Sequence, residues 1–298
     1  MSANFKCRLC AVCDGEACAG ELPGMGGVFD GKNHILNCKG WKKIFPLIPQ
    51  EKIEAAQAQF SVGRMRLAPI TGAEENVGWP DEESFYAPFY EFAARCGLKL
   101  SVGDGCPDQK LQAGIAAVKA LNQKASLTKK AAVFFKPYPQ EKLFERLEWA
   151  APVAEFVGID IDSYNIVTMR NKARLEKKTA AQLSDLRRAA KVPFAVKGVW
   201  TKDDLNMIEE LKPDVAYISN HGGRVETDIG STAEFLLANV ARLKKFCGAV
   251  WVDGGVRSKQ DVCAALALGA QEVLVGRPAI SAFIAKTQHI SQPQPFWL

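Results

Sequence analysis

The chain has 298 residues, of which 48% are hydrophobic, so it can fill the core of one large domain or of two ordinary ones. Its net charge of +5 is mild, and its Lys and Arg residues are spread rather than clustered, which argues against a nucleic-acid surface. The chain shows no basic leader followed by an apolar run, and no stretch approaches the roughly 18 apolar residues of a membrane span, so we expect a cytoplasmic protein. Nine cysteines without a secretion signal favour reduced thiols or a metal site over disulfides.

Residues 1–48 form a cysteine-rich N-terminal segment that shows little apolar periodicity and needs something external to order it. Short gaps separate four of its cysteines, which are Cys7, Cys10, Cys13 and Cys18. Four thiolates at such spacings can bind Zn or an iron–sulfur cluster, because soft sulfur ligands suit both. The spacing is not that of bacterial ferredoxins, since the last gap is four residues and no Pro follows Cys18. The alternative is four reduced cysteines in a packed loop.

Residues 49–298 have a regular pattern that opens with a predicted helix over 50–60. Eight short apolar strand candidates then follow, and helical stretches separate them. The candidates are Met65–Ala68, Leu98–Val102, Ala131–Phe135, Phe156–Ile161, Phe194–Val199, Val215–Ser219, Ala249–Val252 and Glu272–Val275. Four helix starts have the form of a capping box or come near it, at Thr179, Thr201, Ser231 and Ser258. This rhythm predicts an α/β fold of the (β/α)8 TIM-barrel type. An open doubly wound sheet fits nearly as well, but the first strand lacks the glycine-rich turn that such sheets use for dinucleotides.

A barrel builds its active site at the C-terminal ends of its strands, so polar residues and glycines should gather there. They follow all eight predicted strands. The last two ends carry glycines together with arginines, in Asp253–Arg257 and in Gly276–Pro278. Such loops offer backbone N–H groups and positive charge to a phosphate, and barrels often bind one at this place.

The end of the sixth strand carries the sequence Ser-Asn-His-Gly-Gly-Arg over residues 219–224. His221 can take a proton near neutral pH, and the planar guanidinium of Arg224 can bind a carboxylate through two parallel hydrogen bonds. Gly222 and Gly223 permit a tight turn and the close approach of a flat ligand. A lone histidine at a strand end is, however, structural more often than catalytic.

This loop closely resembles the active-site signature of the FMN-dependent 2-hydroxy-acid dehydrogenases and oxidases, the family of glycolate oxidase and lactate oxidase. The resemblance runs from about residue 60 to residue 280, in order and with the correct spacing. Its strongest parts are Val196–Gly198, Ser219–Arg224, Asp253–Arg257, Ala265–Ala270 and Gly276–Pro278.

The resemblance implies a role for each matching residue. His221 would be the catalytic base, Arg224 would bind the substrate carboxylate, and Asp162 would steady the protonated histidine. Lys197 would stabilise the negative charge that collects on the reduced flavin. Tyr138 would lie near flavin and substrate. The residues expected to bind FMN are Pro69, Thr71, Ser101, Lys197, Ser219, Asp253, Gly254, Gly255, Arg257, Gly276 and Arg277.

Some of these assignments have rivals, and the chain also departs from the family pattern. Asp160 competes with Asp162, and Tyr138 can equally be a packing residue. Lys136 stands where a glutamine that touches the flavin is usual, and the aspartate expected soon after Arg224 is displaced to Asp228. The cysteine-rich segment replaces the family's N-terminal helices and their substrate-covering tyrosine. The helix that closes the barrel looks short.

The sequence therefore predicts one FMN-binding barrel that oxidises a small L-2-hydroxy acid of the lactate or glycolate type to the 2-keto acid. We expect the cysteine-rich segment to lie on the C-terminal face of the barrel, and we expect a homo-oligomer with no nucleic-acid partner. The electron acceptor stays open. The rival functions are another FMN barrel chemistry, such as that of type 2 isopentenyl diphosphate isomerase, and a non-catalytic flavin- or metal-binding sensor.

Overall fold

The computed structural model describes residues 31–125, 130–166, 169, 172–225, 227–289 and 294–298. The four predicted metal ligands, Cys7, Cys10, Cys13 and Cys18, lie outside these ranges. No helix in the described ranges is long and apolar enough to cross a membrane.

Eight parallel strands form a single sheet in the order β1-β8-β7-β6-β5-β4-β3-β2. The strands are β1 (Met65–Leu67), β2 (Leu100–Gly103), β3 (Ala131–Phe135), β4 (Ala154–Asp160), β5 (Phe194–Val199), β6 (Val215–Ile218), β7 (Ala249–Val252) and β8 (Glu272–Val275). A bridge between Arg66 and Lys99 joins β1 to the start of β2 and closes the sheet into a barrel. The predicted (β/α)8 fold is confirmed.

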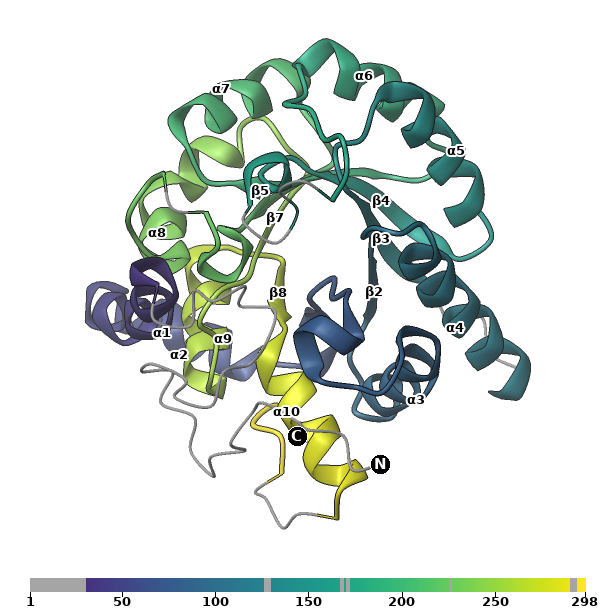
Figure 1. Ribbon diagram of the computed structural model, residues 1–298. Coiled ribbons are helices and arrows are strands. Elements are labelled where there is room, and N and C mark those ends of the chain that lie inside the picture. The colour runs from purple at the N-terminus through teal and green to yellow at the C-terminus, as the bar shows by residue number, and fades with distance from the viewer. Residues whose placement is uncertain (1–30, 126–129, 167–168, 170–171, 226, 290–293) are drawn as a thin grey trace.

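Helices follow the strands and form the outer ring of the barrel (Figure 1). The ring contains α3 (Glu82–Arg95), α4 (Gln109–Ala125), α5 (Gln140–Ala150), α6 (Ala180–Ala189), α7 (Lys202–Leu211), α8 (Thr232–Leu243), α9 (Lys259–Leu268) and α10 (Arg277–Thr287). Complete capping boxes start α6, α7 and α9, as the sequence predicts. At α8 the Ser231 side chain accepts from the Glu234 N–H, but the Glu234 carboxylate accepts from the Ser231 hydroxyl, so the box is incomplete.

The N-terminal part of the described chain is helical and packs on this ring. Helix α1 (Lys32–Ile44) lies beside α8, and α2 (Gln50–Ala58) lies beside α9 (Figure 1). The prediction that the cysteine-rich segment replaces N-terminal helices is therefore wrong for residues 32–44, which form α1. Its buried face includes Asn33, His34 and Asn37, so the apolar spacing that identifies a helix in a sequence is missing.

Several predicted ends shift by one or two residues. β1 ends at Leu67, β6 ends at Ile218, and α2 ends at Ala58. β2 begins at Leu100 rather than Leu98, and β4 runs from Ala154 to Asp160 rather than from Phe156 to Ile161. Apolar residues just outside a strand are also buried here, so hydrophobicity alone does not mark the last ladder bond.

Two apolar layers fill the protein. Aromatic and aliphatic side chains fill the inside of the barrel, among them Phe134, Tyr217, Trp251 and Leu274. A larger layer lies between the strands and the helices. The closing helix α10 has 11 residues and packs through Phe283 against Phe85 and Phe89 of α3.

The N-terminal end of the barrel contains a buried guanidinium. Arg66 is fully buried and donates to the Leu100 carbonyl at 2.7 Å, to Glu155 at 2.6 Å and to Glu272 at 2.6 Å. It therefore connects β1 to β2, β4 and β8 at the end of the barrel opposite the predicted site.

Candidate active site

The loop after β6 holds His221 in a constrained backbone conformation. Residues 221–223 form one turn of 3₁₀ helix, and the Asn220 side chain accepts a hydrogen bond from the Gly223 N–H at 3.0 Å. His221 itself has a φ of 57°, in the left-handed region that non-glycine residues rarely occupy. Such a conformation costs on the order of 1–3 kcal/mol and concentrates at functional sites, so the loop is built to aim this imidazole.

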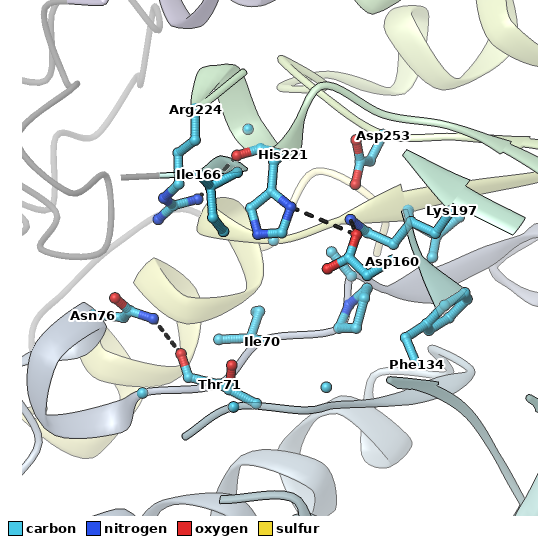
Figure 2. Close-up of a pocket in the computed structure, with 18 of the residues that line it drawn as sticks. Ile70, Thr71, Asn76, Phe134, Asp160, Ile166, Lys197, His221, Arg224 and Asp253 are labelled. Atoms are coloured by element: carbon cyan, nitrogen blue, oxygen red, sulfur yellow. Dashed lines mark hydrogen bonds and ion pairs between the residues drawn. The ribbon is translucent and has the colours of Figure 1, made fainter. Parts of the chain in front are cut away.

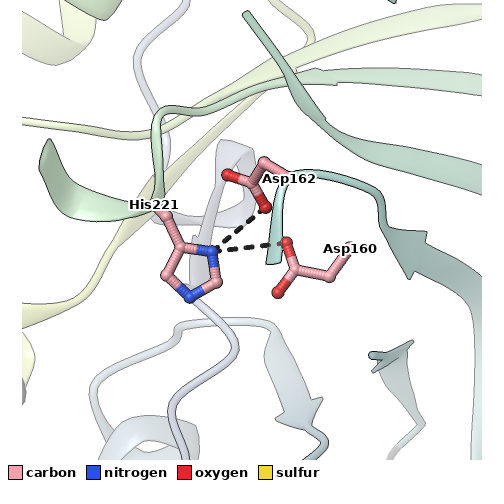
Figure 3. A group of neighbouring side chains, drawn as sticks. All are labelled: Asp160, Asp162 and His221. Atoms are coloured by element: carbon pink, nitrogen blue, oxygen red, sulfur yellow. Dashed lines mark hydrogen bonds and ion pairs between the residues drawn. The ribbon is translucent and has the colours of Figure 1, made fainter. Parts of the chain in front are cut away.

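Two carboxylates from the end of β4 face the imidazole (Figure 3). His221 Nδ1 lies 3.1 Å from Asp162 Oδ1 and 3.6 Å from Asp160 Oδ1. Burial raises the pKa of Asp162, and the neighbouring Asp160 raises it further. Asp162 is the nearer carboxylate and can accept a hydrogen bond from the Nδ1–H group. The other ring nitrogen, Nε2, is then free to accept a proton.

Asp160 binds two lysines on the floor of the site. Lys136 Nζ and Lys197 Nζ each lie 2.7 Å from a different oxygen of Asp160, and all three side chains are buried. Burial alone would raise the pKa of Asp160, but Lys136 and Lys197, together with His221, hold that pKa well below its usual range. Burial would lower the pKa of Lys197, yet Asp160 raises it above its usual value. Lys136 Nζ also lies 3.4 Å from His221 Nε2.

We expect Asp160→Asn to lower the free energy of unfolding by ~3–5 kcal/mol, because it leaves two buried ammonium groups without their shared anion. The depressed pKa of Asp160 means that this stabilisation is present at neutral pH and is lost as the pH falls below the usual carboxyl range. Urea unfolding at pH 7 measures the effect. The control is Asp185→Asn, which removes an exposed pair with Arg188 and should cost less than ~1 kcal/mol. Equal unfolding midpoints for the two variants would show that Asp160 does not neutralise the lysines.

Figure 2 shows the cavity into which these groups point. Arg224 lines it beside His221, and its Nη1 donates to the His221 carbonyl at 3.0 Å. Burial lowers the pKa of Arg224 to about 10, and the nearby Asp160 and Asp162 oppose that shift. The guanidinium stays charged at neutral pH and can bind an anionic group that enters the cavity.

The end of the cavity formed by the loops after β7 and β8 combines glycines with two arginines. Its lining includes Gly254, Gly255, Arg257, Gly276 and Arg277. Helix α10 begins at Arg277, but Pro278 has no N–H and the N–H groups of Ala279 and Ile280 donate to the Gly276 carbonyl, so the two guanidinium groups are the main donors for an anion. This end fits a phosphate.

Between the two ends lies a buried carboxylate. Asp253 lines the cavity, and its Oδ2 accepts a hydrogen bond from the Tyr217 hydroxyl at 2.6 Å. Its Oδ1 is buried and has no hydrogen-bond partner among the described residues. A ligand that carries hydroxyl donors would satisfy this oxygen. Pro69 and Thr71, after β1, line the wall of the same cavity.

Four predicted site residues do not line this cavity in the described part of the chain, namely Asp162, which reaches it only through His221, and Tyr138, Ser101 and Ser219. Tyr138 is buried, donates to the Gly105 carbonyl at 3.0 Å and packs its ring 4.1 Å from the Arg146 guanidinium carbon. Ser101 is also buried, and Ser219 accepts a hydrogen bond from the His221 N–H at 3.2 Å. Tyr138 and Ser219 therefore bind loops of the site without lining the cavity.

The structure adds residues that the sequence did not single out. His34 lies 3.0 Å from Arg277, and Asp104 lines the cavity and pairs with the buried Arg146 at 2.8 Å. Burial raises the pKa of Asp104 to about 6. At the mouth, Glu75 binds Lys110 and Lys172. His34 carried no signal because it belongs to no motif and lies well beyond the four cysteines of its segment.

Sequence comparison identifies the family of this chain. The family model described as FMN-dependent dehydrogenase matches residues 116–289, which is more than half of the chain. The chain belongs to the FMN-dependent dehydrogenase family.

Two relatives match a part of the chain. The peroxisomal (S)-2-hydroxyacid oxidase GLO3 of Arabidopsis thaliana is 42% identical over 101 residues, which are 34% of this chain and 28% of the relative. The L-lactate oxidase of Roseobacter sp. (strain GAI101) is 42% identical over 108 residues, which are 36% of this chain and 28% of the relative. The matched segment thus spans less than a third of these proteins.

Solved structures share the fold over a longer range. A mandelate oxidase variant superimposes with a TM-score of 0.62 at 19% identity, covering 91% of this chain and 87% of that one. Mandelate oxidase with benzoyl-formic acid gives a TM-score of 0.56 at 22% identity, covering 74% of this chain and 67% of that one. At these identities the likeness shows the barrel fold alone.

Proposed function

We propose that this protein uses FMN to oxidise a small L-2-hydroxy acid of the lactate or glycolate type to the 2-keto acid. The observation that carries the proposal is that His221 and Arg224 meet Lys197 in one cavity whose far end fits a phosphate. A base, a carboxylate anchor and a cation for the reduced cofactor are the groups that this reaction needs. The relatives named above as oxidases of 2-hydroxy acids and L-lactate support the same reaction class.

The residues present fit FMN. Arg257, Arg277 and the glycines beside them would bind its phosphate, and the unpartnered oxygen of Asp253 would accept from a hydroxyl of its ribityl chain. Lys197 lies within the buried strand β5 among carboxylates, which keep its ammonium charged and in place. When bound, FMN supplies the two-electron acceptor of the reaction.

The protein's own groups would then act on the substrate. Arg224 binds the substrate carboxylate and orients the hydroxyl-bearing carbon. His221 Nε2 would take the hydroxyl proton while the hydrogen on the same carbon leaves with its bonding electron pair as a hydride to the cofactor, which leaves the 2-keto acid. The Asp162 carboxylate, 3.1 Å from Nδ1, stabilises the imidazolium that forms.

Four further expectations belong to the proposal and come from the sequence. The four N-terminal cysteines would bind Zn or an iron–sulfur cluster, which elemental analysis of anaerobically purified protein tests. The protein would act in the cytoplasm as a homo-oligomer. Its electron acceptor would be a small molecule or another protein.

Anaerobic titration of the FMN-loaded protein with a panel of 2-hydroxy acids tests the function directly. We expect L-lactate or glycolate to bleach the flavin absorbance and D-lactate to leave it unchanged. Isopentenyl diphosphate should not reduce the flavin. Bound FMN that no 2-hydroxy acid reduces would favour the non-catalytic sensor and contradict the proposal.

A further inference from the structure

Helix α1 contacts three of the loops that form the candidate site, although it lies outside the family match at residues 116–289. On the loop after β6, Asn37 and Asn220 exchange two side-chain hydrogen bonds, at 2.7 Å and 3.1 Å. On the loop after β7, Trp41 Nε1 donates to the Gly254 carbonyl at 2.8 Å. On the loop after β8, His34 contacts Arg277.

The glycines of these loops let the backbone of α1 approach closely. A Cβ on Gly223 would lie 2.5 Å from the backbone nitrogen of His34, and a Cβ on Gly255 would lie 1.9 Å from the carbonyl oxygen of Asn37. Both glycines also have positive φ, of 92° and 73°. No side chain fits at either position, so these glycines serve the docking of α1 as well as the turns in which they lie.

The contact between His34 and Arg277 has a defined donor and acceptor. A guanidinium only donates, so Arg277 Nη1 donates to His34 Nδ1 at 3.0 Å, and the imidazole proton must lie on Nε2. The second nitrogen, Nη2, donates to the Gly222 carbonyl at 3.0 Å. Arg277 is thus held from two sides while it lines the cavity.

The environment of His34 keeps its imidazole neutral, so that Nδ1 can accept the hydrogen bond from Arg277 at all physiological pH values. It is 1% exposed, and burial lowers its pKa to about 2, with further lowering by Arg277, Arg257 and Arg224. The ring therefore stays neutral at physiological pH. A charged ring here would repel three guanidinium groups.

We propose that His34 is a positioning residue that aims Arg277 at the phosphate of the flavin nucleotide, so that helix α1 completes the cofactor site. The identity of the ligand in this inference rests on the proposed function. The coupling of His34 to Arg277 is independent of that function.

Paired binding measurements with FMN and riboflavin test the proposal, because riboflavin lacks only the phosphate. We expect His34→Leu to weaken FMN binding by ~10- to 100-fold, the value of one hydrogen bond to a charged group, and to change riboflavin binding by less than about twofold. His34→Asn places an oxygen near the position of Nδ1 and should stay within about threefold of the parent for FMN. Lys42→Leu, on the exposed side of α1, is the matched control. Equal losses for FMN and riboflavin in His34→Leu would assign His34 a structural role only and overturn the proposal.

A ligand-free measurement separates this proposal from the proposed function. The chain has only three histidines, so ¹⁵N-labelled imidazole spectra of the protein without FMN are simple to assign. We expect a neutral His34 ring between pH 5 and 8 whose Nδ1 signal shifts in Arg277→Leu and stays in place in Arg188→Leu. If the parent bound no FMN but this shift occurred, the proposed function would fail and the coupling would stand. An unchanged Nδ1 signal in Arg277→Leu would reject the coupling itself.

Discussion

His221→Gln should bind FMN normally and reduce it ~10²- to 10⁴-fold more slowly with the substrate, which is the usual contribution of a positioned general base. The amide cannot take the proton that His221 Nε2 would accept. FMN binding should survive because the predicted phosphate and ribityl contacts come from other loops. Anaerobic stopped-flow absorbance of the flavin measures the rate, and fluorescence titration measures binding.

The matched control is His289→Gln, since His289 is exposed at the end of α10. It should reduce the flavin at the parental rate. Reduction by His221→Gln within about threefold of the parent would remove this histidine from the mechanism.

Arg224→Lys should raise the KM for the 2-hydroxy acid by about 10- to 100-fold, because a hydrogen bond to a charged group contributes ~1.5–3 kcal/mol. An ammonium retains the charge but cannot form two parallel bonds to a carboxylate. The shorter lysine side chain also loses the hydrogen bond that Arg224 donates to the His221 carbonyl. Steady-state kinetics over a wide substrate range measure KM and kcat separately.

Arg188→Lys serves as the control, because Arg188 lies on the exposed face of α6 and pairs with Asp185. Its KM should equal that of the parent. A parental KM in Arg224→Lys would place the substrate carboxylate elsewhere in the cavity.

The barrel was predictable because its strands are buried on both sides and therefore appear as short apolar runs. Helix α1 was not predictable by the same means. Its inner face carries Asn33 and Asn37, which bind a loop carbonyl and an amide 192 and 183 positions away, and His34, which contacts the Arg277 guanidinium 243 positions away. Only the folded barrel supplies those partners.

The site divides in the same way. His221, Arg224, Lys197 and the two glycine–arginine loops follow strand ends and form motifs, so the sequence could propose them together. The pairing of Lys136 with Asp160 depends on the register of β3 and β4, in which Phe135 lies beside Ile159. In the sequence, Lys136 and Asp160 are each recognisable as a charged residue at the end of an apolar strand. That they neutralise each other is seen only in the folded structure.

The strands β1 and β2 are joined by few hydrogen bonds, which affects where the barrel can open. Two backbone hydrogen bonds join Lys99 to Met65 and Leu67, whereas Arg66 ties this junction to β4 and β8 only at the end away from the cavity. At the cavity end, one side-chain hydrogen bond joins the two strand ends, from the Thr71 hydroxyl to the Asp104 carbonyl at 3.1 Å. Because local unfolding follows the route that breaks the fewest contacts, we expect the wall between β1 and β2 to open at this end when that bond breaks, while the Arg66 end stays closed. Thr71 and Gly103 line the cavity at that edge. Opening of this wall would therefore widen the candidate site directly.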